Sequence, residues 1–254
     1  MSEIFKNVAV VILAAGMGKR MRSKKAKVLH EILGKPMVLY VVETAKKIVG
    51  SNIVVVVGHQ GEKVQAVVAQ KADARFAYQA KQLGTGHAVL CALPHIPATC
   101  ENVIILCGDV PLIRPQTLRA FIKDHLKAER DVSLLAVEME NPKGYGRVLL
   151  DKDSRLYGIV EEADANANQK RLKFINTGIY CVKRDFLSKA LPQLRSENAQ
   201  GEFYLTDIIG IGYSAKLNLG INVGGDDLEV LGVNTLHDLK NIEKIVKTQG
   251  RNRS

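Results

Sequence analysis

The stretch VAVVILAAGMGKRM, residues 8–21, decides the fold of this 254-residue chain. Its first six residues are all apolar, which predicts a strand buried on both faces, as in a parallel sheet. A loop with glycines at 16 and 18 follows the strand directly. Loops at the carboxyl ends of parallel strands bind ligands in α/β proteins, and glycines let backbone N–H groups approach phosphate oxygens. The stretch therefore predicts an α/β protein with a phosphate-binding loop.

The charge of the chain gathers beside that loop. There are 36 Lys and Arg against 26 Asp and Glu, which gives a formal charge of +10. Seven basic residues lie from Gly18 to Lys35, against the single acid Glu31. No Phe, Tyr or Trp lies among them to stack on bases, so a small polyanion is favoured over nucleic acid. Met21 stands where a dinucleotide-binding loop needs glycine, and a Walker A loop would need glycine at Leu13.

Helical and strand patterns alternate along the rest of the chain, which predicts a Rossmann-like α/β fold with a mostly parallel sheet flanked by helices. In the second half the strands follow one another closely, which predicts an antiparallel extension. Further strands are expected at residues 53–57, 75–79, 103–106, 132–137, 146–150, 156–160, 174–182 and 219–223. Helices are expected at residues 36–49, 62–69, 85–93, 115–127, 185–191, 207–215 and 236–247, followed by a frayed tail at 250–254.

The apolar runs of the sequence argue against a membrane-spanning protein and against a secretory signal peptide. No run of 18 apolar residues exists, and the apolar run at 8–15 is too short to span a bilayer and lacks the flanks of a signal peptide. The four cysteines, at 91, 100, 107 and 181, form no CxxC pair and no zinc spacing. A reduced, cytoplasmic protein is expected.

Motifs spread over nearly the whole chain resemble those of the sugar-phosphate nucleotidyltransferase family. The loop LAAGxGxRM is followed by KVLHxxxGKPM at 27–37, QLGTGHA at 82–88 and GDVPL at 108–112. GYGR, IVE, INTG, NAQGEFYLTD and GVN follow in order, at 144–147, 159–161, 175–178, 198–207 and 232–234. The set is most similar to the UDP-N-acetylglucosamine pyrophosphorylases, which form the N-terminal, uridylyltransferase half of a bifunctional bacterial enzyme.

The resemblance implies a nucleotide-diphospho-sugar transferase fold and an Mg²⁺-dependent reaction of UTP with N-acetylglucosamine-1-phosphate. A single domain, 1–254, is expected, with a nucleotide part (about 1–130), a sugar part (about 131–234) and a C-terminal helix and tail (235–254). No left-handed β-helix repeats, as in an acetyltransferase domain, follow residue 240. No nucleic-acid or membrane partner is expected, and the oligomeric state stays open.

The resemblance also implies roles for individual residues. Arg20, Lys27 and Asp109 would be catalytic, and Asp109 and Asn234 would hold Mg²⁺. The nucleotide would be bound by Leu13, Ala14, Ala15, Gly16, Lys27, Gln79, Gln82, Gly84 and Thr85. The sugar would be bound by Gly108, Gly146, Glu161, Asn176, Tyr204 and Thr206. The central expectation is that Arg20 and Lys27 converge with Asp109 and Asn234, although they lie far apart in the chain.

Simpler interpretations stay open for several of these residues. Asp109 could cap a turn, Asn234 could cap the last helix, Gln79 could be a polar residue at a strand end, and Glu161 could be a surface charge on a hairpin. The histidines at 30, 59 and 87 are expected to make polar contacts or begin helices, and those at 95, 125 and 237 to lie on the surface.

Three residues depart from the family pattern. Ala26 stands where proline is usual, Lys19 where Thr or Ser is usual, and Cys107 where tyrosine is usual. Because of Cys107, an alternative stays open, in which the protein is a nucleotidyltransferase for another sugar-1-phosphate or nucleoside triphosphate. A non-catalytic nucleotide-sugar-binding protein is the alternative from another class, and a nucleic-acid binder is a third.

Overall fold

A computed structural model describes residues 5–251 and shows a nine-stranded mixed sheet. Seven of its strands follow the order β11-β7-β10-β6-β1-β4-β5, and the other two, β8 and β9, branch from β10. The central strand β1 (Val8–Leu13) lies between β4 (Ile53–Val57) and β6 (Asn102–Cys107) and is parallel to both. Strand β5 (Arg75–Tyr78) extends this parallel part beyond β4. The parallel core of the predicted α/β fold is confirmed.

The second half of the chain adds antiparallel pairings, as expected. Strand β10 (Phe174–Lys183) runs antiparallel to β6 and to β7 (Val132–Glu138). The hairpin of β8 (Arg147–Leu150) and β9 (Leu156–Val160) branches from β10. The edge strand β11 (Leu219–Val223) pairs parallel with β7.

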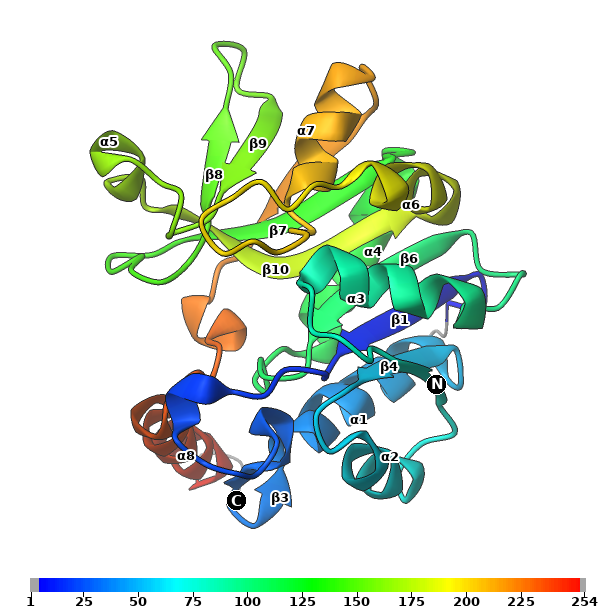
Figure 1. Ribbon diagram of the computed structural model, residues 1–254, viewed down its shortest axis with the longest axis vertical. Helices are drawn as coiled ribbons and strands as arrows, with labels where there is room; N and C mark the ends of the chain where they lie inside the picture. Colours follow the sequence, from blue (N-terminus) through cyan, green and yellow to red (C-terminus); the bar gives the residue numbers. More distant parts are fainter. Residues whose placement is uncertain (1–4, 252–254) are drawn as a thin grey trace.

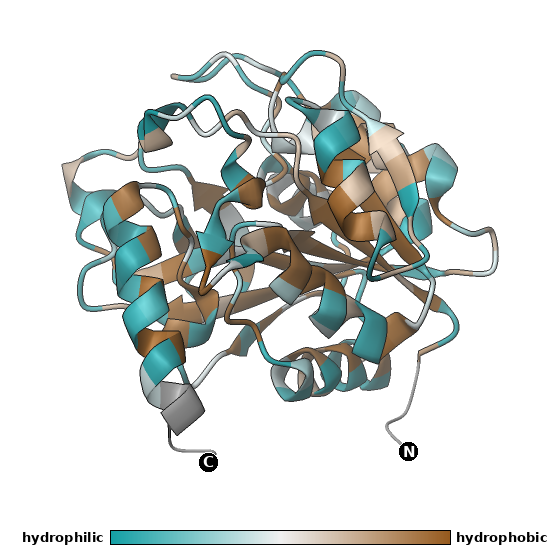
Figure 2. Ribbon diagram, turned by 90° about the horizontal axis from the view of Figure 1, so that it is seen from below, coloured by the Kyte–Doolittle hydropathy of each residue, from teal (hydrophilic) through white to brown (hydrophobic). Residues whose placement is uncertain are grey.

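Helices cover both faces of the sheet, because side chains of each strand alternate between two cores (Figure 2). In β1, Val8, Val10 and Ile12 belong to one core, and Ala9 and Val11 to the other. The first core is covered by α1 (Met37–Val49), α2 (Gly61–Ala69) and α4 (Pro115–Lys127). The second is covered by α3 (Thr85–Ala92), α6 (Arg184–Ala190) and α7 (Asp207–Ser214).

A third, smaller core joins the two ends of the chain. Helix α8 (Leu236–Arg251) packs beside the hairpin of β2 (Glu31–Ile32) and β3 (Lys35–Pro36), and Figure 1 shows it next to the loop that follows β1. Met21 and Ile32 from the first part of the chain pack here with Val233 and Ile242 from the last part. This core brings the phosphate loop against the segment that carries Asn234.

The sequence did not predict the β2–β3 hairpin or the short helix α5 (Ala167–Lys170), because elements of two to four residues carry no periodicity. It also did not predict five 3₁₀ helices, at Lys19–Met21, Lys27–Leu29, Leu93–His95, Leu191–Gln193 and Asp227–Val230. Helix α8 extends to Arg251, and the rest of the expected frayed tail, 252–254, lies outside the described residues. No helix in residues 5–251 has the length and apolar character needed to cross a membrane.

The prediction that His125 lies on the surface is wrong. His125 is 1% exposed and lies between α4 and the sheet, where its Nδ1 is 2.8 Å from Ser133 Oγ and its Nε2 3.2 Å from Asn102 Oδ1. It follows Leu118, Phe121 and Ile122 on the buried face of α4. The spacing i, i+3, i+4, i+7 contained this signal, because it is the spacing of a buried helix face. His95 and His237 are exposed, as expected.

Candidate active site

Loops from neighbouring strands meet at the carboxyl edge of the parallel part of the sheet. Leu13 at the end of β1 is in register with Cys107 at the end of β6. The Gly108 N–H donates to the Leu13 carbonyl at 2.9 Å, and the Ala14 N–H donates to the Val56 carbonyl at 2.9 Å. The register of three strands therefore places the phosphate loop beside Asp109.

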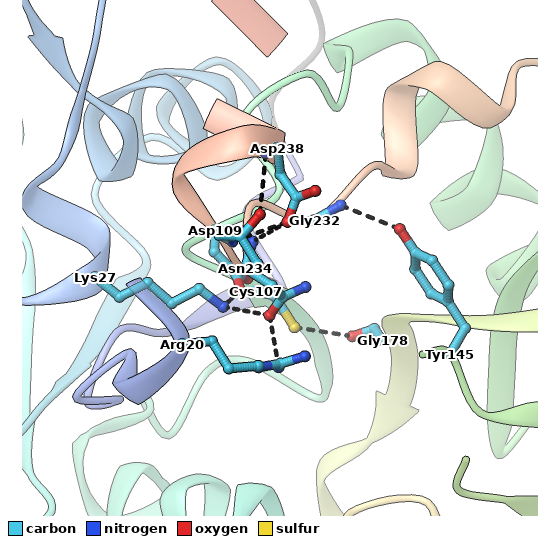
Figure 3. A network of polar contacts seen from close by, with 10 residues as sticks. Arg20, Lys27, Cys107, Asp109, Tyr145, Gly178, Gly232, Asn234 and Asp238 are labelled. Carbon is cyan, nitrogen blue, oxygen red and sulfur yellow. Dashed lines mark hydrogen bonds and ion pairs between the residues drawn. The ribbon is translucent and has the colours of Figure 1, made fainter. Parts of the chain in front are cut away.

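Four polar side chains from three distant segments converge at this edge (Figure 3). Lys27 Nζ forms an ion pair with Asp109 Oδ2 and donates to Asn234 Oδ1 at 2.8 Å. Arg20 Nη2 donates to the same Asn234 Oδ1, also at 2.8 Å. The sequence predicted this convergence, and the structure shows it.

The backbone around Asn234 explains why its side chain is available to these cations. The Val233 N–H donates to the Asp109 carbonyl at 2.9 Å, which ties the two segments together. The first turn of α8 is capped by its neighbours instead: Thr235 Oγ1 accepts from the Asp238 N–H at 3.1 Å, and Asp238 Oδ2 accepts from the Thr235 N–H at 2.8 Å. The alternative in which Asn234 caps α8 is wrong, because Thr235 and Asp238 form the capping pair.

Gly18 lets Lys27 approach the loop. Gly18 has a left-handed φ of 68°, and a Cβ atom added there would lie 2.7 Å from Lys27 Cβ. Any larger residue would be strained and would push the lysine side chain. A Cβ atom added at Gly16 would have no other atom within 4 Å. The two glycines therefore differ: Gly18 packs against a catalytic candidate, and Gly16 leaves the loop accessible.

Asp109 and Asn234 are suited to hold a divalent cation together with a nucleotide. A carboxylate and an amide oxygen here approach one and the same ammonium, Lys27 Nζ, so they already face a common positive charge. Oxygen donors are the ligands of Mg²⁺, which commonly takes one or two from the protein and the rest from phosphates and water. No group of three His, Cys, Asp or Glu side chains able to hold a metal occurs within residues 5–251. The donor set fits a metal shared with substrate phosphates.

A cleft of about 250 Å³ opens beside the converging side chains. It is lined by many of the predicted nucleotide-binding residues, among them Leu13, Ala15, Gly16, Lys27, Gln79, Gln82, Gly84 and Thr85. Asp109 and Cys107 also line it. A larger cavity of about 980 Å³, between α6, α7 and β9, contains none of the four converging side chains.

Gln79 is buried and lines this cleft, so it is more than an exposed polar residue at the end of β5. Its Nε2 donates to the Gly84 carbonyl and lies 3.0 Å from His87 Nδ1. Gln82 Nε2 donates to the Gln79 carbonyl at 3.1 Å. His87 therefore makes a polar contact, as expected from the sequence, and this contact with Gln79 orients the Gln79 amide.

The segment 198–207 packs on the loop 82–86, so two of the quoted motifs form one structure. The Phe203 N–H donates to the Leu83 carbonyl at 2.8 Å, and the Gly86 N–H donates to the Phe203 carbonyl at 2.8 Å. A Cβ atom at Gly84 would lie 2.6 Å from that Phe203 carbonyl oxygen. The hydroxyl of Thr85 accepts from the Leu205 N–H at 3.0 Å, so part of its role is to join these segments.

Four of the six predicted sugar-binding residues lie close to one another: Gly146 just before β8, Glu161 just after β9, Asn176 in β10 and Thr206 just before α7. Gly108 lies apart from them, directly after β6 and beside Leu13. Thr206 Oγ1 donates to Glu161 Oε1 at 3.3 Å. A Cβ atom at Gly146 would lie 3.3 Å from Glu161 Oε2 and 3.5 Å from Asn176 Cβ. Burial raises the pKa of Glu161 above its ordinary value, so this carboxyl is no solvated hairpin charge. The Tyr204 hydroxyl donates to Asp164 Oδ2 at 3.1 Å, and burial raises its pKa to about 12.

Cys107 lines the 250 Å³ cleft and also contacts β10. Its Sγ is 3.9 Å from the Gly178 carbonyl oxygen, and a Cβ atom at Gly178 would lie 3.0 Å from that sulfur. Burial raises the pKa of the Cys107 thiol to about 12, with the charge of Asp109 acting in the same direction. The thiol is therefore neutral at physiological pH.

The histidines of the matched segments do not take part in the convergence. His59 Nε2 lies 3.4 Å from the Lys24 carbonyl oxygen, a polar contact of the expected kind. His30 Nε2 is buried and has no hydrogen-bond partner among the described residues, so the expected contact is absent at this atom. Burial, together with Lys25, lowers the pKa of His30.

Sequence reasoning missed two residues that support the site. The Tyr145 hydroxyl accepts from the Gly232 N–H at 3.4 Å and so links the loop before β8 to the Asn234 segment. Gln60, at the start of α2, hydrogen-bonds the backbone ahead of Lys27. Neither residue has a local signal of this role. Two further supporting residues, Thr235 and Asp238, do have one, because their T-x-x-D spacing is that of a capping pair.

Comparison with known proteins finds relatives over most of the chain. The chain is 48% identical over 232 residues to the bifunctional protein GlmU of Geotalea uraniireducens, covering 90% of this chain and 50% of that protein. It is 42% identical over 232 residues to the bifunctional protein GlmU of Desulfotalea psychrophila, covering 91% of this chain and 68% of that protein. The chain spans about half the length of most of the curated relatives it matches.

A solved structure shares the fold. A putative glucose-1-phosphate thymidylyltransferase from Bacillus anthracis superimposes with a TM-score of 0.71 over 94% of both chains, at 18% sequence identity. Residues 10–175 match the family described as the MobA-like NTP transferase domain, and this range contains most of β1, the loop that follows it and Asp109. The chain therefore belongs to the MobA-like NTP transferase family, and its fold is that of a nucleotidyltransferase.

Proposed function

We propose that this chain transfers the uridylyl group of UTP to N-acetylglucosamine-1-phosphate and releases pyrophosphate. The observation that carries the proposal is the convergence of Arg20 and Lys27 with Asp109 and Asn234 at the carboxyl edge of the sheet. Two polyanions have to meet in this reaction, so their repulsion has to be neutralised. The motif set and the relationship to bifunctional GlmU proteins favour this substrate pair.

The reaction needs positioning and charge more than a protein nucleophile. A phosphate oxygen of the sugar phosphate attacks the α-phosphorus of UTP and forms a new P–O bond. The bond from the α-phosphorus to the bridging oxygen breaks, and pyrophosphate leaves with the electron pair. Arg20 and Lys27 would bind the triphosphate and stabilise the charge that grows on it in the transition state.

Asp109 and Asn234 would hold Mg²⁺, which supplies further neutralisation of phosphate charge when bound. In the structure both side chains contact Lys27 Nζ, and this ammonium would add its own positive charge toward the phosphates. The single carboxylate leaves the remaining metal positions to phosphate and water.

The other predicted residues would divide between the two substrates. The backbone of residues 13–16 would contact the phosphates, and the Gln79, Gln82, Gly84 and Thr85 group would bind the base in the 250 Å³ cleft. Gly108, Gly146, Glu161, Asn176, Tyr204 and Thr206 would bind the sugar. Apart from Gly108, this assigns about 1–130 to the nucleotide and about 131–234 to the sugar. We place the reaction in the cytoplasm, since all four cysteines are unpaired thiols.

The test is pyrophosphate release from UTP with a panel of sugar phosphates and Mg²⁺. We expect N-acetylglucosamine-1-phosphate with UTP to give the highest kcat/KM, with chelation of the metal by EDTA abolishing turnover. Asp109→Asn keeps the shape of the side chain and removes its charge, and we expect it to lower kcat at least 100-fold, because it acts on the developing charge. A preference for glucose-1-phosphate or CTP would refute the substrate assignment.

One observation favours a nucleotidyltransferase with another sugar-1-phosphate or nucleoside triphosphate as its substrate. Cys107 places a small side chain where the base and the sugar would meet. The same panel distinguishes it. A non-catalytic nucleotide-sugar-binding protein would bind UDP-N-acetylglucosamine with no pyrophosphate release. A nucleic-acid binder would bind random duplex with a steep salt dependence, and UTP would compete poorly.

A further inference from the structure

The backbone directly before Lys27 is held by one side chain from another element. Gln60 Oε1 accepts from the Ala26 N–H at 3.0 Å, and Gln60 Nε2 donates to the Lys24 carbonyl at 3.1 Å. The 3₁₀ turn Lys27–Leu29 begins at the next residue and carries the lysine that reaches Asp109. One amide therefore clamps the backbone on both sides of Lys25.

The hydrogen bond from Ala26 to Gln60 satisfies a buried backbone N–H group. Ala26 is 0% exposed, so its N–H has to find its partner inside the protein. Gln60 supplies that partner from a left-handed backbone conformation, with φ 52° and ψ 37°. A residue with a Cβ atom adopts this conformation only at a cost in free energy. The two hydrogen bonds offset that cost.

Proline would meet the same requirement in a different way. Ala26 has φ −54° and ψ 137°, which lies within the range that a proline ring imposes. Proline has no N–H, so a chain with proline at this position needs no acceptor there. Proline is also the usual residue at this position in the family that the sequence resembles. The Ala26–Gln60 pair and proline are thus two solutions to the same backbone geometry.

We propose that Gln60 is a positioning residue for Lys27, in that its amide holds residues 24–26 so that Lys27 can bind the triphosphate of UTP. This inference rests on the proposed function. Without the amide, the loop has to open locally so that water can bond the Ala26 N–H. UTP then binds only the fraction of molecules with a closed loop, so its apparent affinity falls by that fraction.

The first variant is Gln60→Met, which removes donor and acceptor at similar length. We expect the KM for UTP to rise about tenfold, the size of effect of one lost buried hydrogen bond. The kcat at saturating UTP and the KM for N-acetylglucosamine-1-phosphate should stay within about twofold, because UTP closes the loop. Gln65→Met, at a half-buried position of the same helix, is the matched control and should change none of these values.

The second variant tests the pair. Ala26→Pro in the Gln60→Met background should return the KM for UTP to within about threefold of the unmodified chain, because no N–H is left unpaired. Ala26→Pro alone should raise the KM, because the ring displaces the Gln60 amide. Gln60→Gly removes the left-handed strain as well as the amide, so it should raise the KM for UTP even where it raises the Tm.

Several results would overturn the inference. One is an unchanged KM for UTP in Gln60→Met, and another is a lower kcat with both KM values unchanged, as partial misfolding would give. A third is a failure of Ala26→Pro to rescue Gln60→Met. Amide hydrogen exchange of residues 22–30 separates this inference from the proposed function. It should be at least tenfold faster in Gln60→Met without substrate, whether or not the unmodified chain transfers uridylyl groups, and equal exchange would refute the clamp.

Discussion

Acidification is expected to destabilise this protein through His125, a residue far from the cleft. Burial lowers the pKa of His125 from 6.5 to about 4, and the charges of Arg130 and Lys183 act in the same direction, against Asp131 and Asp124. Above pH 6.5 the histidine is neutral in both the folded and unfolded states. Between 6.5 and about 4 the unfolded chain takes up a proton that the folded chain does not.

The free energy of unfolding therefore falls as the pH falls through this window. The slope is about 1.4 kcal/mol per pH unit for one proton. From pH 6.5 to 5.0 this gives a loss of about 2 kcal/mol, from the product of that slope and 1.5 units. Such a loss is a large part of the 5–15 kcal/mol that is roughly typical of a folded domain.

The assay is urea unfolding followed by far-UV circular dichroism at pH 7.5, 6.5, 5.5 and 5.0. His125→Gln keeps hydrogen-bonding groups near Ser133 and Asn102 and cannot titrate, so its loss from pH 7.5 to 5.0 should be about 2 kcal/mol smaller than that of the unmodified chain. His95→Gln, at an exposed position, is the matched control and should keep the full loss. Equal losses in the unmodified chain and His125→Gln would refute the reasoning.

The remaining predictions concern the candidate site. Gly18→Ala should lower kcat/KM for UTP at least tenfold, since the added Cβ would displace Lys27. The control is Gly34→Ala: Gly34 has a similar φ of 78°, but a Cβ there would have nothing within 4 Å, so only about 1 kcal/mol of stability should be lost. Equal activities of the two variants would contradict the clash. Cys107 should resist iodoacetamide at pH 8 in the folded protein and react in urea, by peptide mass spectrometry, because burial keeps its pKa near 12; rapid modification of the folded chain would show that the thiol is accessible. Glu161→Gln should raise the KM for the sugar phosphate about tenfold with the KM for UTP unchanged, in steady-state pyrophosphate assays, since one charged hydrogen-bond acceptor is lost; an effect on UTP alone would move Glu161 out of the sugar site.

Most secondary elements could be predicted because their signals are local. The apolar run at 8–13 forms β1 with the expected bounds, and the proline at 115 opens α4 as expected. The β2–β3 hairpin at 31–36 could not be predicted, because each of its strands has two residues and depends on packing against α8. The burial of His125 does not follow from its residue type, because histidine is polar; it follows from the position of His125 on the apolar face of α4.

For the candidate site, the sequence by itself determined which residue types are present and in what order, since glycines, cations, a carboxylate and an amide are readable one by one. Only the tertiary structure decided that Arg20, Lys27, Asp109 and Asn234 meet, because the register of β1 with β6 and the small core under α8 are long-range contacts. The same holds for Gln60. Its amide acquires a role only where α2 passes the buried N–H of Ala26, 34 residues earlier in the chain, and no local pattern records that approach.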